Sequence, residues 1–201
     1  FTPMNAKTSV ITGATSGIGH AVAKGLAARN FELVLLGRDR NKGAAVVEDL
    51  KKQTNNQSVT FYTVDLCSQK QIRQTGEEIR AKHPRIDVLI NNAGVWTSRC
   101  ELTDEKIEKQ FAVNHLAYFL LTHLLYANIA KSPDGRIINM GSDSHKFGRI
   151  NFNDYNLQTS YHGLKAYGQS KLAKLLFTYE LQRLKNEDHV SVYCVQPGLV
   201  K

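Results

Sequence analysis

Two tyrosine–lysine pairs in this chain of 201 residues have side chains that could transfer a proton. Tyr167 and Lys171 stand four residues apart, so both lie on one face of a helix. A nearby ammonium favours the phenolate, which would let the phenol act as a general acid–base. Tyr161 and Lys165 repeat the spacing, but about 240° separates the two tyrosines on one helix, so they cannot share a site. We choose Tyr167 because its segment continues into an apolar helical stripe, although such pairs also occur on exposed helix surfaces.

Two further polar residues are expected to complete this site. Ser142 follows a short apolar segment, and its hydroxyl could hold a substrate carbonyl oxygen beside the phenol. Ser144 is a rival for this role, and a helix-capping serine is the alternative. Asn114 falls between Phe111 and Tyr118 on the apolar face of an expected helix. A buried amide without a partner costs about 1–3 kcal/mol, so Asn114 either makes a structural hydrogen bond or holds a functional water.

A glycine-rich segment could bind a phosphate. Residues 12–19 read Thr-Gly-Ala-Thr-Ser-Gly-Ile-Gly and join an expected strand to an expected helix. The glycines allow a tight turn and close approach of the backbone to a ligand, and the helix N-terminus offers free N–H groups to an anion. The segment therefore predicts a dinucleotide site, although a purely structural turn would look the same. The expected contacts are Gly13, Thr15, Ser16, Gly17, Ile18 and Gly19.

The ends of the following strands refine this prediction. Gly37 takes the place of the acidic residue that would accept a hydrogen bond from a ribose 2′-hydroxyl, and Arg38 follows it. A guanidinium can pair with a 2′-phosphate, so we expect NADP(H) rather than NAD(H), unless Arg38 is only a surface residue or Asp39 weakens the contact. Asp65 either accepts from the adenine amine or caps the next helix. The remaining expected contacts are Leu66, Asn92, Ala93 and Gly94.

Alternating strands and helices are expected to position these residues. The apolar patterns predict strands at 9–11, 32–36, 59–64, 86–90, 136–140 and 190–195, and helices at 18–29, 42–52, 69–82, 103–129 and 167–185. A long loop is expected over 142–160. This alternation predicts a single α/β domain over residues 1–201: a three-layer, doubly wound parallel sheet of Rossmann type with strand order 3-2-1-4-5-6. Ligands bind such sheets at the carboxyl ends of the strands.

Composition limits the alternatives. The net charge of +8 invites a nucleic-acid interpretation, but the 26 Lys and Arg are scattered, so we expect no nucleic-acid partner. The 3 Cys and 7 His show no metal-ligand spacing, so we expect no metal, and the cysteines favour a reducing compartment. The apolar stretches are too short to span a bilayer and no secretory signal is visible, so we expect a cytoplasmic protein. A membrane anchor in a segment before Phe1 stays open.

In combination, these motifs resemble the short-chain dehydrogenase/reductase family. The motifs are residues 12–19, residues 91–94, Asn114, Ser142, the Tyr167–Lys171 pair and Pro197-Gly198. Residues 37–39, 142–145 and 167–173 are most similar to the branch that contains the retinol dehydrogenases. Gly141 departs from that branch, which usually has the first serine of a pair there. The chain stops at Lys201, whereas family members continue into a substrate lid and a final strand.

The resemblance implies an oxidoreductase that transfers a hydride between NADP(H) and a small alcohol or carbonyl substrate. Tyr167 would exchange a proton with the substrate oxygen, and Ser142 would orient that oxygen. Lys171 would favour the phenolate and hold the nicotinamide ribose. Asn114 would hold a water that connects Lys171 to solvent. These four residues are the expected catalytic set.

The resemblance carries further expectations. Pro197 and Gly198 would flank the nicotinamide, and the chain would lack the last strand of the family. A homodimer or homotetramer is expected through the two long helices. The alternative function is a non-catalytic NADP-binding scaffold or redox sensor, which would need only the cofactor residues. A sugar-nucleotide epimerase is disfavoured by the glycine spacing.

Overall fold

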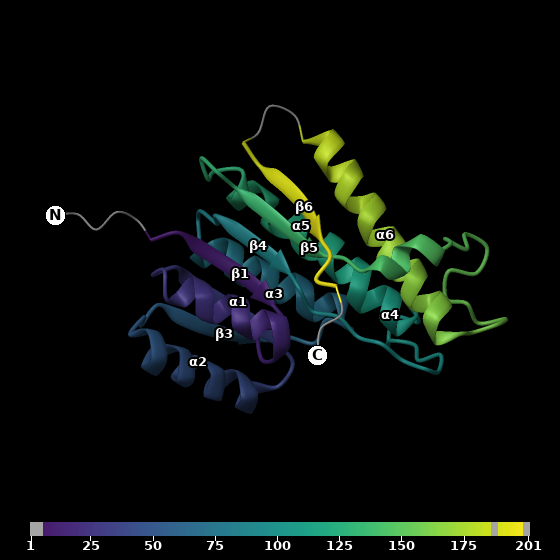
Figure 1. The fold of residues 1–201 in the computed structure, drawn as a ribbon, viewed down its shortest axis with the longest axis horizontal. Helices are drawn as coiled ribbons and strands as arrows, with labels where there is room; N and C mark the ends of the chain where they lie inside the picture. Colours follow the sequence, from purple (N-terminus) through teal and green to yellow (C-terminus); the bar gives the residue numbers. More distant parts are fainter. Residues whose placement is uncertain (1–5, 186–188, 199–201) are drawn as a thin grey trace.

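Six parallel strands alternate with helices along the computed structural model, which describes residues 6–185 and 189–198 (Figure 1). The elements are β1 (Thr8–Thr12), α1 (Gly17–Ala27), β2 (Glu32–Gly37), α2 (Arg40–Thr54), β3 (Val59–Thr63), α3 (Gln69–Lys82), β4 (Val88–Asn91), α4 (Lys109–Phe111), the π-helix η1 (Ala112–Leu116), α5 (Ala117–Ile129), β5 (Arg136–Met140), the 3₁₀-helix η2 (Asp143–Phe147), α6 (Gly163–Leu184) and β6 (Ser191–Val195). The strands lie in the order β3-β2-β1-β4-β5-β6, which confirms the predicted topology.

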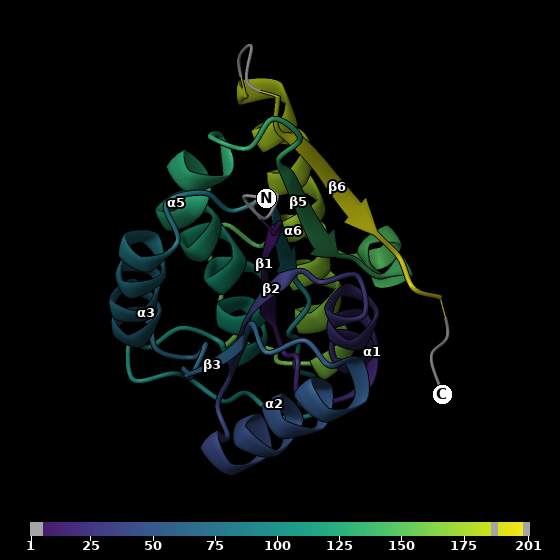
Figure 2. The same ribbon diagram turned by 90° about the vertical axis from the view of Figure 1, so that its left-hand side faces the viewer.

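Helices cover both faces of the sheet and form two cores (Figure 2). On one face, α1 and α2 pack over Ile11, Leu33 and Leu35. On the other, α3, α5 and α6 pack over the alternate residues of the same strands, such as Val10 and Val34. Burial on both faces explains why these strands read as continuous apolar runs. The strands' carboxyl ends meet at one edge, where the candidate site residues follow them.

The prediction of one helix over 103–129 is wrong at its start, and the helical segment that the structure has instead is interrupted. Residues 101–108 form a loop in which Leu102 bridges to Glu108, and α4 begins only at Lys109. The Glu108 carboxylate accepts from the N–H groups of Gln110 (3.0 Å) and Phe111 (2.7 Å), which caps α4. The helix then passes through the π-helical turn η1 before α5.

The last helix also differs from its prediction. It begins at Gly163, so Tyr161 precedes it, and the argument that placed both tyrosines on one helix was wrong. Part of its apolar stripe is exposed: Leu176 keeps 49% and Tyr179 64% of its surface accessible. The buried side of α6 instead carries small and polar residues because it fits closely against the end of β5. The expected loop after Ser142 contains η2.

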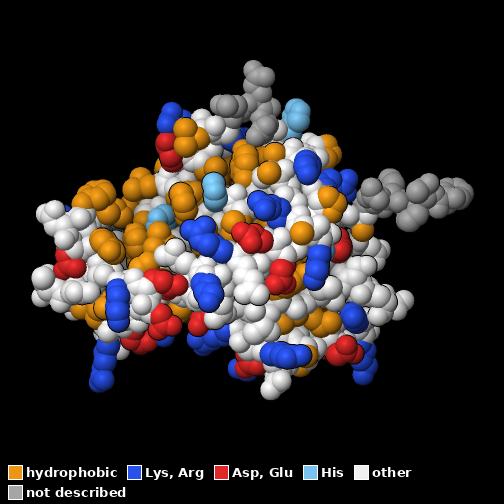
Figure 3. All heavy atoms as spheres, turned by 180° about the vertical axis from the view of Figure 1, so that it is seen from behind, with side chains coloured by type: hydrophobic (Ala, Val, Ile, Leu, Met, Phe, Trp, Pro, Cys, Tyr) orange, Lys and Arg blue, Asp and Glu red, His pale blue; other side chains and the backbone are white. Residues whose placement is uncertain are grey.

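The outward sides of α5 and α6 form an apolar surface, which we name the α5/α6 face. A groove of about 580 Å³ runs along it, lined by Phe119, Thr122, His123, Tyr126, Ala127, Phe177, Glu180, Leu181, Leu184 and Lys185. Figure 3 shows hydrophobic side chains gathered over these two helices. Among the described residues, no helix combines the length and apolar character needed to cross a membrane.

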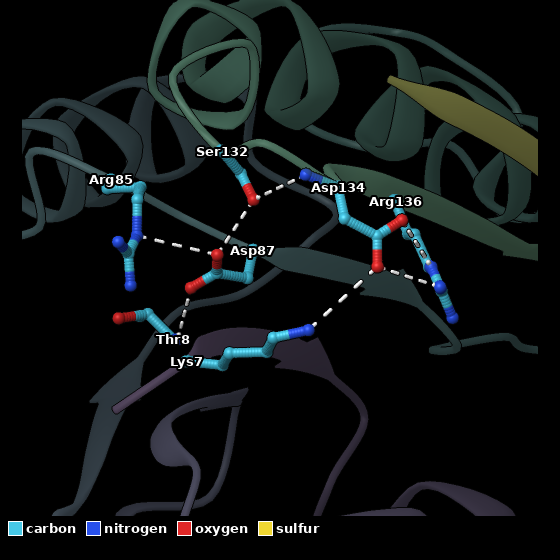
Figure 4. A network of polar contacts seen from close by, with 7 residues as sticks. All are labelled: Lys7, Thr8, Arg85, Asp87, Ser132, Asp134 and Arg136. Atoms are coloured by element: carbon cyan, nitrogen blue, oxygen red, sulfur yellow. Dashed lines mark hydrogen bonds and ion pairs between the residues drawn. The ribbon is translucent and has the colours of Figure 1, made fainter. Parts of the chain in front are cut away.

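A buried carboxylate joins three strands at the opposite edge of the sheet (Figure 4). Asp87 accepts from the Thr8 N–H (2.8 Å) and the Ser132 hydroxyl (2.7 Å), and it lies 3.4 Å from the Arg85 guanidinium. Asp134, nearby, pairs with Lys7 and Arg136 at the surface. The Asp87 side chain therefore ties the start of β1 and the segment before β5 to the start of β4.

Asp87→Ala is expected to lower the free energy of unfolding by about 2–4 kcal/mol, because two buried donors lose their acceptor. Urea denaturation measures this change. Asp134→Ala is the matched control, because its ion pairs are half exposed and are worth about 0–1 kcal/mol. Equal losses in the two variants would contradict the assigned role of Asp87.

Candidate functional site

The glycine-rich turn after β1 packs directly against the end of β4. Gly13 has a φ of +66°, and a methyl group added there would lie 2.8 Å from Ala93 Cα. A methyl group on Gly19 would lie 2.3 Å from the Gly13 carbonyl oxygen and 2.5 Å from Asn92 Nδ2. Contacts this short exclude any side chain, so both positions require glycine. The Asn92 amide donates to the carbonyls of Thr12 (3.0 Å) and Gly13 (3.2 Å), which ties the turn to β4.

A cavity of about 550 Å³ opens beside this turn at the ends of β1 to β4. Its lining includes ten of the predicted cofactor residues: Gly13, Thr15, Ser16, Ile18, Arg38, Asp65, Leu66, Asn92, Ala93 and Gly94. Ser16 is the N-cap of α1, and within the described chain its hydroxyl makes no capping bond. The start of α1 is therefore open to an anion. Gly17 and Gly19 shape the turn without lining the cavity.

Two cations lie at the β2 side of this cavity. Arg38 follows β2, and Lys42 stands in the first turn of α2; both line the cavity and are exposed. The Asp39 carboxylate accepts from the Lys42 N–H (3.0 Å) and caps α2, so it has a structural partner. Sequence reasoning missed Lys42, although its place one helical turn after Arg38 was a usable signal.

Asp65 and Cys67 both line the wall of this cavity. The Asp65 carboxylate accepts from the Cys67 N–H (2.9 Å), whereas Ser68 is the residue that caps α3. The alternative that Asp65 caps the helix was therefore wrong. Burial, with a smaller effect of the Asp65 charge, raises the pKa of the Cys67 thiol to about 11, so the thiol stays protonated.

The Tyr167–Lys171 pair lies next to the end of β5. The Lys171 ammonium donates to the Met140 carbonyl (3.1 Å) and lies 5.3 Å from the centre of the Tyr167 ring. Neither residue lines the cavity, but Gly94 does. A methyl group added to Gly94 would lie 4.0 Å from Lys171 Nζ and 3.4 Å from Asn114 Oδ1. The cavity therefore ends beside this pair.

Asn114 is fully buried within the π-helical turn, and its side chain is satisfied. Its Oδ1 accepts from the Val95 N–H (2.8 Å), and its Nδ2 donates to the Val95 carbonyl (3.0 Å) and the Ser170 hydroxyl (3.1 Å). The Ser170 hydroxyl donates in turn to the Tyr167 carbonyl (2.8 Å). The side-chain amide of Asn114 therefore makes structural hydrogen bonds, which was one of the two alternatives for a buried amide here. These bonds join the segment after β4 to α6.

Ser142 both caps a helix and faces the same edge of the sheet. Its Oγ accepts from the Ser144 N–H (3.3 Å) and from the Ser144 hydroxyl (3.0 Å), at the start of η2. Because the oxygen accepts two hydrogen bonds, the proton of Ser142 remains available for another acceptor. The Ser144 backbone lies against Gly168, next to Tyr167, so η2 packs on α6. Ser144 thus supports Ser142 rather than replacing it.

The second tyrosine–lysine pair has a structural role. The Tyr161 hydroxyl lies 3.0 Å from the Thr97 hydroxyl, accepts from Gln110 Nε2 (2.9 Å) and donates to Glu108 (3.0 Å). Burial raises the pKa of Tyr161, and Lys165 is exposed on α6. These contacts fasten the segment before α6 to α4.

The remaining predicted residues lie apart from the cavity. Pro197 and Gly198 follow β6 and are exposed, with a φ of +72° at Gly198. Gly141, the departure noted in the sequence, faces β6: a methyl group there would lie 2.8 Å from the Cys194 sulfur. The cavity is also lined by Gly37 and Asp39, the two neighbours of Arg38 that entered the choice of NADP(H). Beyond Lys42 and Cys67, the cavity residues that sequence reasoning missed are Val64, Val95 and Val113.

Comparison with known proteins shows which family this chain belongs to. Residues 7–201 match the family described as short chain dehydrogenase. The chain is 42% identical to retinol dehydrogenase 13 of Homo sapiens, over 97% of this chain and 59% of that protein. It is 40% identical to retinol dehydrogenase 12 of Mus musculus, over 96% of this chain and 61% of that protein. The chain thus spans about three fifths of the length of these relatives.

Solved structures agree with this similarity. A crystal structure of an uncharacterised protein from Mycobacterium paratuberculosis superposes with a TM-score of 0.84 at 36% identity, covering 96% of this chain and 68% of that one. A short-chain dehydrogenase from Sphingobium yanoikuyae in complex with NADPH gives a TM-score of 0.77 at 28% identity, covering 94% and 70%.

Proposed function

The chain belongs to the short-chain dehydrogenase family and is similar to its retinol dehydrogenases, and from this premise we propose that it transfers a hydride between NADP(H) and an alcohol or carbonyl substrate. One observation carries the proposal: the cavity at the strand ends reaches Gly94, which lies against Lys171 and Asn114. A dinucleotide along the cavity would bring its far end to the Tyr167–Lys171 pair. The cofactor cavity and the catalytic residues would then lie in one domain.

The residues present fit a nicotinamide dinucleotide. The backbone cradle at Gly13 and Gly19 and the open start of α1 suit a diphosphate. A bound nicotinamide supplies or accepts the hydride. The Arg38 guanidinium and the Lys42 ammonium line the cavity and would hold a 2′-phosphate, and Asp65 would accept from the adenine amine. Pro197 and Gly198 would close over the nicotinamide end.

The protein's own groups would then move the proton. The Tyr167 hydroxyl gives its proton to the substrate oxygen in reduction and takes it back in oxidation. The Lys171 ammonium stabilises the phenolate formed in between. Ser142 donates its free proton to the same oxygen. Asn114 holds the segment after Gly94 in register with α6, and a water at this turn would connect Lys171 to solvent.

Nucleotide titration followed by a panel of carbonyl substrates tests the proposal. We expect NADPH to bind and to be oxidised in the presence of at least one apolar ketone or aldehyde. Binding of NADPH without turnover across the panel would favour the non-catalytic scaffold or sensor. Turnover of a UDP-sugar would favour the epimerase. Absence of nucleotide binding would end the proposal.

Arg38→Ala and Lys42→Ala are each expected to lower kcat/KM for NADPH by about tenfold and to leave kcat/KM for NADH unchanged. The reason is the loss of a charge-assisted contact to the 2′-phosphate worth about 1.5 kcal/mol at an exposed position. Arg40→Ala is the control, because Arg40 is exposed nearby but does not line the cavity. A strong NADH preference that Arg38→Ala leaves unaltered would overturn the choice of NADP(H).

The proposal includes a homodimer or homotetramer that buries the α5/α6 face. Phe119 and Leu184 are large and about half exposed there, which is costly for a monomer in water. Light scattering after size-exclusion chromatography measures the mass of the assembly. A monomer at micromolar concentration would contradict this part of the proposal.

A further inference from the structure

A second lysine lies behind Lys171, in the interior of the protein. Lys174 is 0% exposed, although it carries one of the most strongly hydrated side-chain groups. Its Nζ donates to the Met140 carbonyl at 2.8 Å, and this is the same oxygen that accepts from Lys171 at 3.1 Å. Two amines from one helix therefore converge on a single carbonyl at the end of β5.

The groups that face Lys174 provide no negative charge. The Tyr118 ring of α5 lies with its centre 3.9 Å from Nζ, and burial raises the pKa of its phenol well above the usual value. Burial lowers the pKa of His115 in η1 to about 4, and burial raises that of Cys194 in β6. From α6 itself comes Lys171, and Tyr167 of the same helix interacts with Tyr118. Within residues 6–185 and 189–198, no carboxylate lies at ion-pair distance from Lys174.

Two charged ammonium groups cannot share this place. Burial removes the water that would solvate Lys174, and the Lys171 ammonium repels a second positive charge; together they hold the pKa of Lys174 well below its usual value. The contact with the Tyr118 ring favours the charged form, but a single cation–π contact is weaker than the loss of hydration. Lys174 is therefore the member of the pair that stays uncharged.

An uncharged amine differs from an ammonium because it can accept a hydrogen bond. Lys174 uses one N–H on the Met140 carbonyl, the oxygen that also accepts from Lys171, and the lone pair of an uncharged Lys174 would be free to accept from its neighbour. We propose that Lys174 is a positioning residue, an uncharged amine that accepts a hydrogen bond from the Lys171 ammonium and, with the Met140 carbonyl, holds it beside Tyr167 and Gly94. The catalytic consequence of this inference rests on the proposed function. The uncharged state of Lys174 does not depend on that function.

The state of Lys174 can be measured without any turnover. Protein labelled with ¹³C at lysine Cε gives one NMR signal per lysine, and the pH titration of each signal reports its charge. We expect one signal, assigned with Lys174→Gln, to titrate at clearly lower pH than the signals of the other lysines. If it titrates together with the exposed lysines, the proposal is wrong, whether or not the protein is a dehydrogenase. The titration itself is run on the wild-type protein, and the Lys174→Gln variant serves only to assign the signal.

Kinetics test the positioning role. Lys174→Met keeps the length and apolar stem but removes the nitrogen, and we expect kcat to fall by about 10–100-fold while the KM for NADPH changes little. In the wild-type protein, Lys174 takes up a proton as the pH falls, and the two ammonium groups then repel each other. This protonation adds an ionisation to the acid side of the profile of kcat against pH. That ionisation should be absent from Lys174→Met and Lys174→Gln.

Two outcomes of the kinetic test separate positioning from simple support of the core. If the pH profiles of the variants and the wild type superimpose after scaling, the role of Lys174 is only structural and the proposal fails. Lys165→Met, on the exposed side of the same helix, should keep both the wild-type rate and the wild-type profile. A wild-type protein that lacks dehydrogenase activity would instead contradict the proposed function, and the NMR titration would still decide the state of Lys174.

Discussion

Tyr167→Phe is expected to lower kcat by about 10²–10⁴-fold, the usual contribution of a general acid–base, and to leave NADPH affinity within about twofold. The phenylalanine keeps the ring beside the Lys171 ammonium but removes the hydroxyl that exchanges a proton with the substrate. Because Tyr167 does not line the dinucleotide cavity, nucleotide binding should survive. Stopped-flow reduction of a carbonyl substrate and NADPH fluorescence titration measure the two effects separately.

Tyr161→Phe provides the matched control for this experiment. Its hydroxyl lies at the centre of a hydrogen-bond cluster with Thr97, Gln110 and Glu108, away from the cavity. We expect this variant to lose stability by about 1–3 kcal/mol because buried polar groups lose a partner, while kcat stays close to the wild-type value. If Tyr161→Phe abolished turnover and Tyr167→Phe did not, the assignment of the acid–base residue would have to be reversed.

Gly19→Ala is expected to weaken NADPH binding by about 100-fold or more. The added methyl group would lie 2.3 Å from the Gly13 carbonyl oxygen, so the turn must move away from the end of β4. Such a movement misplaces the N–H groups that hold the diphosphate, and loss of one or two charge-assisted hydrogen bonds has this effect. Isothermal titration measures the change in affinity. Overpacking should also cost about 1–3 kcal/mol of stability.

Gly25→Ala, in the same helix α1, shows what the substitution does without a clash. Apart from the adjacent residues and the backbone of α1 itself, no described atom lies within 4 Å of a methyl group placed there, and the position is exposed. We expect wild-type NADPH affinity and a gain in stability of about 0.5–1 kcal/mol, because alanine is the better residue within a helix. Unaltered affinity in Gly19→Ala would mean that the close packing of the turn is not what holds the nucleotide.

The strand order and the glycine turn were predictable because their signals are local. Short apolar segments that end in small or polar residues mark buried parallel strands, and the strand–turn–helix context identifies residues 12–19. Ten of the predicted cofactor residues line one cavity for the same reason: the topology brings the ends of β1 to β4 together. Lys42 was missed because its approach to the cavity beside Arg38 depends on how α2 packs in the fold.

The parts that could not be predicted depend on contacts between distant residues. Glu108 delays the start of α4 because its carboxylate is held by Tyr161, which lies more than forty positions further along the chain. The π-helical turn at Asn114 is fixed by Val95 and Ser170, from two other segments. Helical periodicity placed the leucines of α6 in the core and gave no reason to bury Lys174. Its burial depends on the Met140 carbonyl, which only the folded chain brings near.

The contact between Gly141 and Cys194 restricts the order in which this site can change during evolution. A serine at 141, usual in the branch that the chain resembles, would place its Cβ 2.8 Å from the Cys194 sulfur. That intermediate is overpacked and would cost about 1–3 kcal/mol. Shortening Cys194 to alanine first would leave only a small void and would remove the shortest of these contacts, so that the nearest remaining atom is the Val195 carbonyl oxygen at 3.3 Å. A lineage that acquires the second hydroxyl at this strand end must therefore either turn the thiol on the neighbouring strand to another rotamer or give it up.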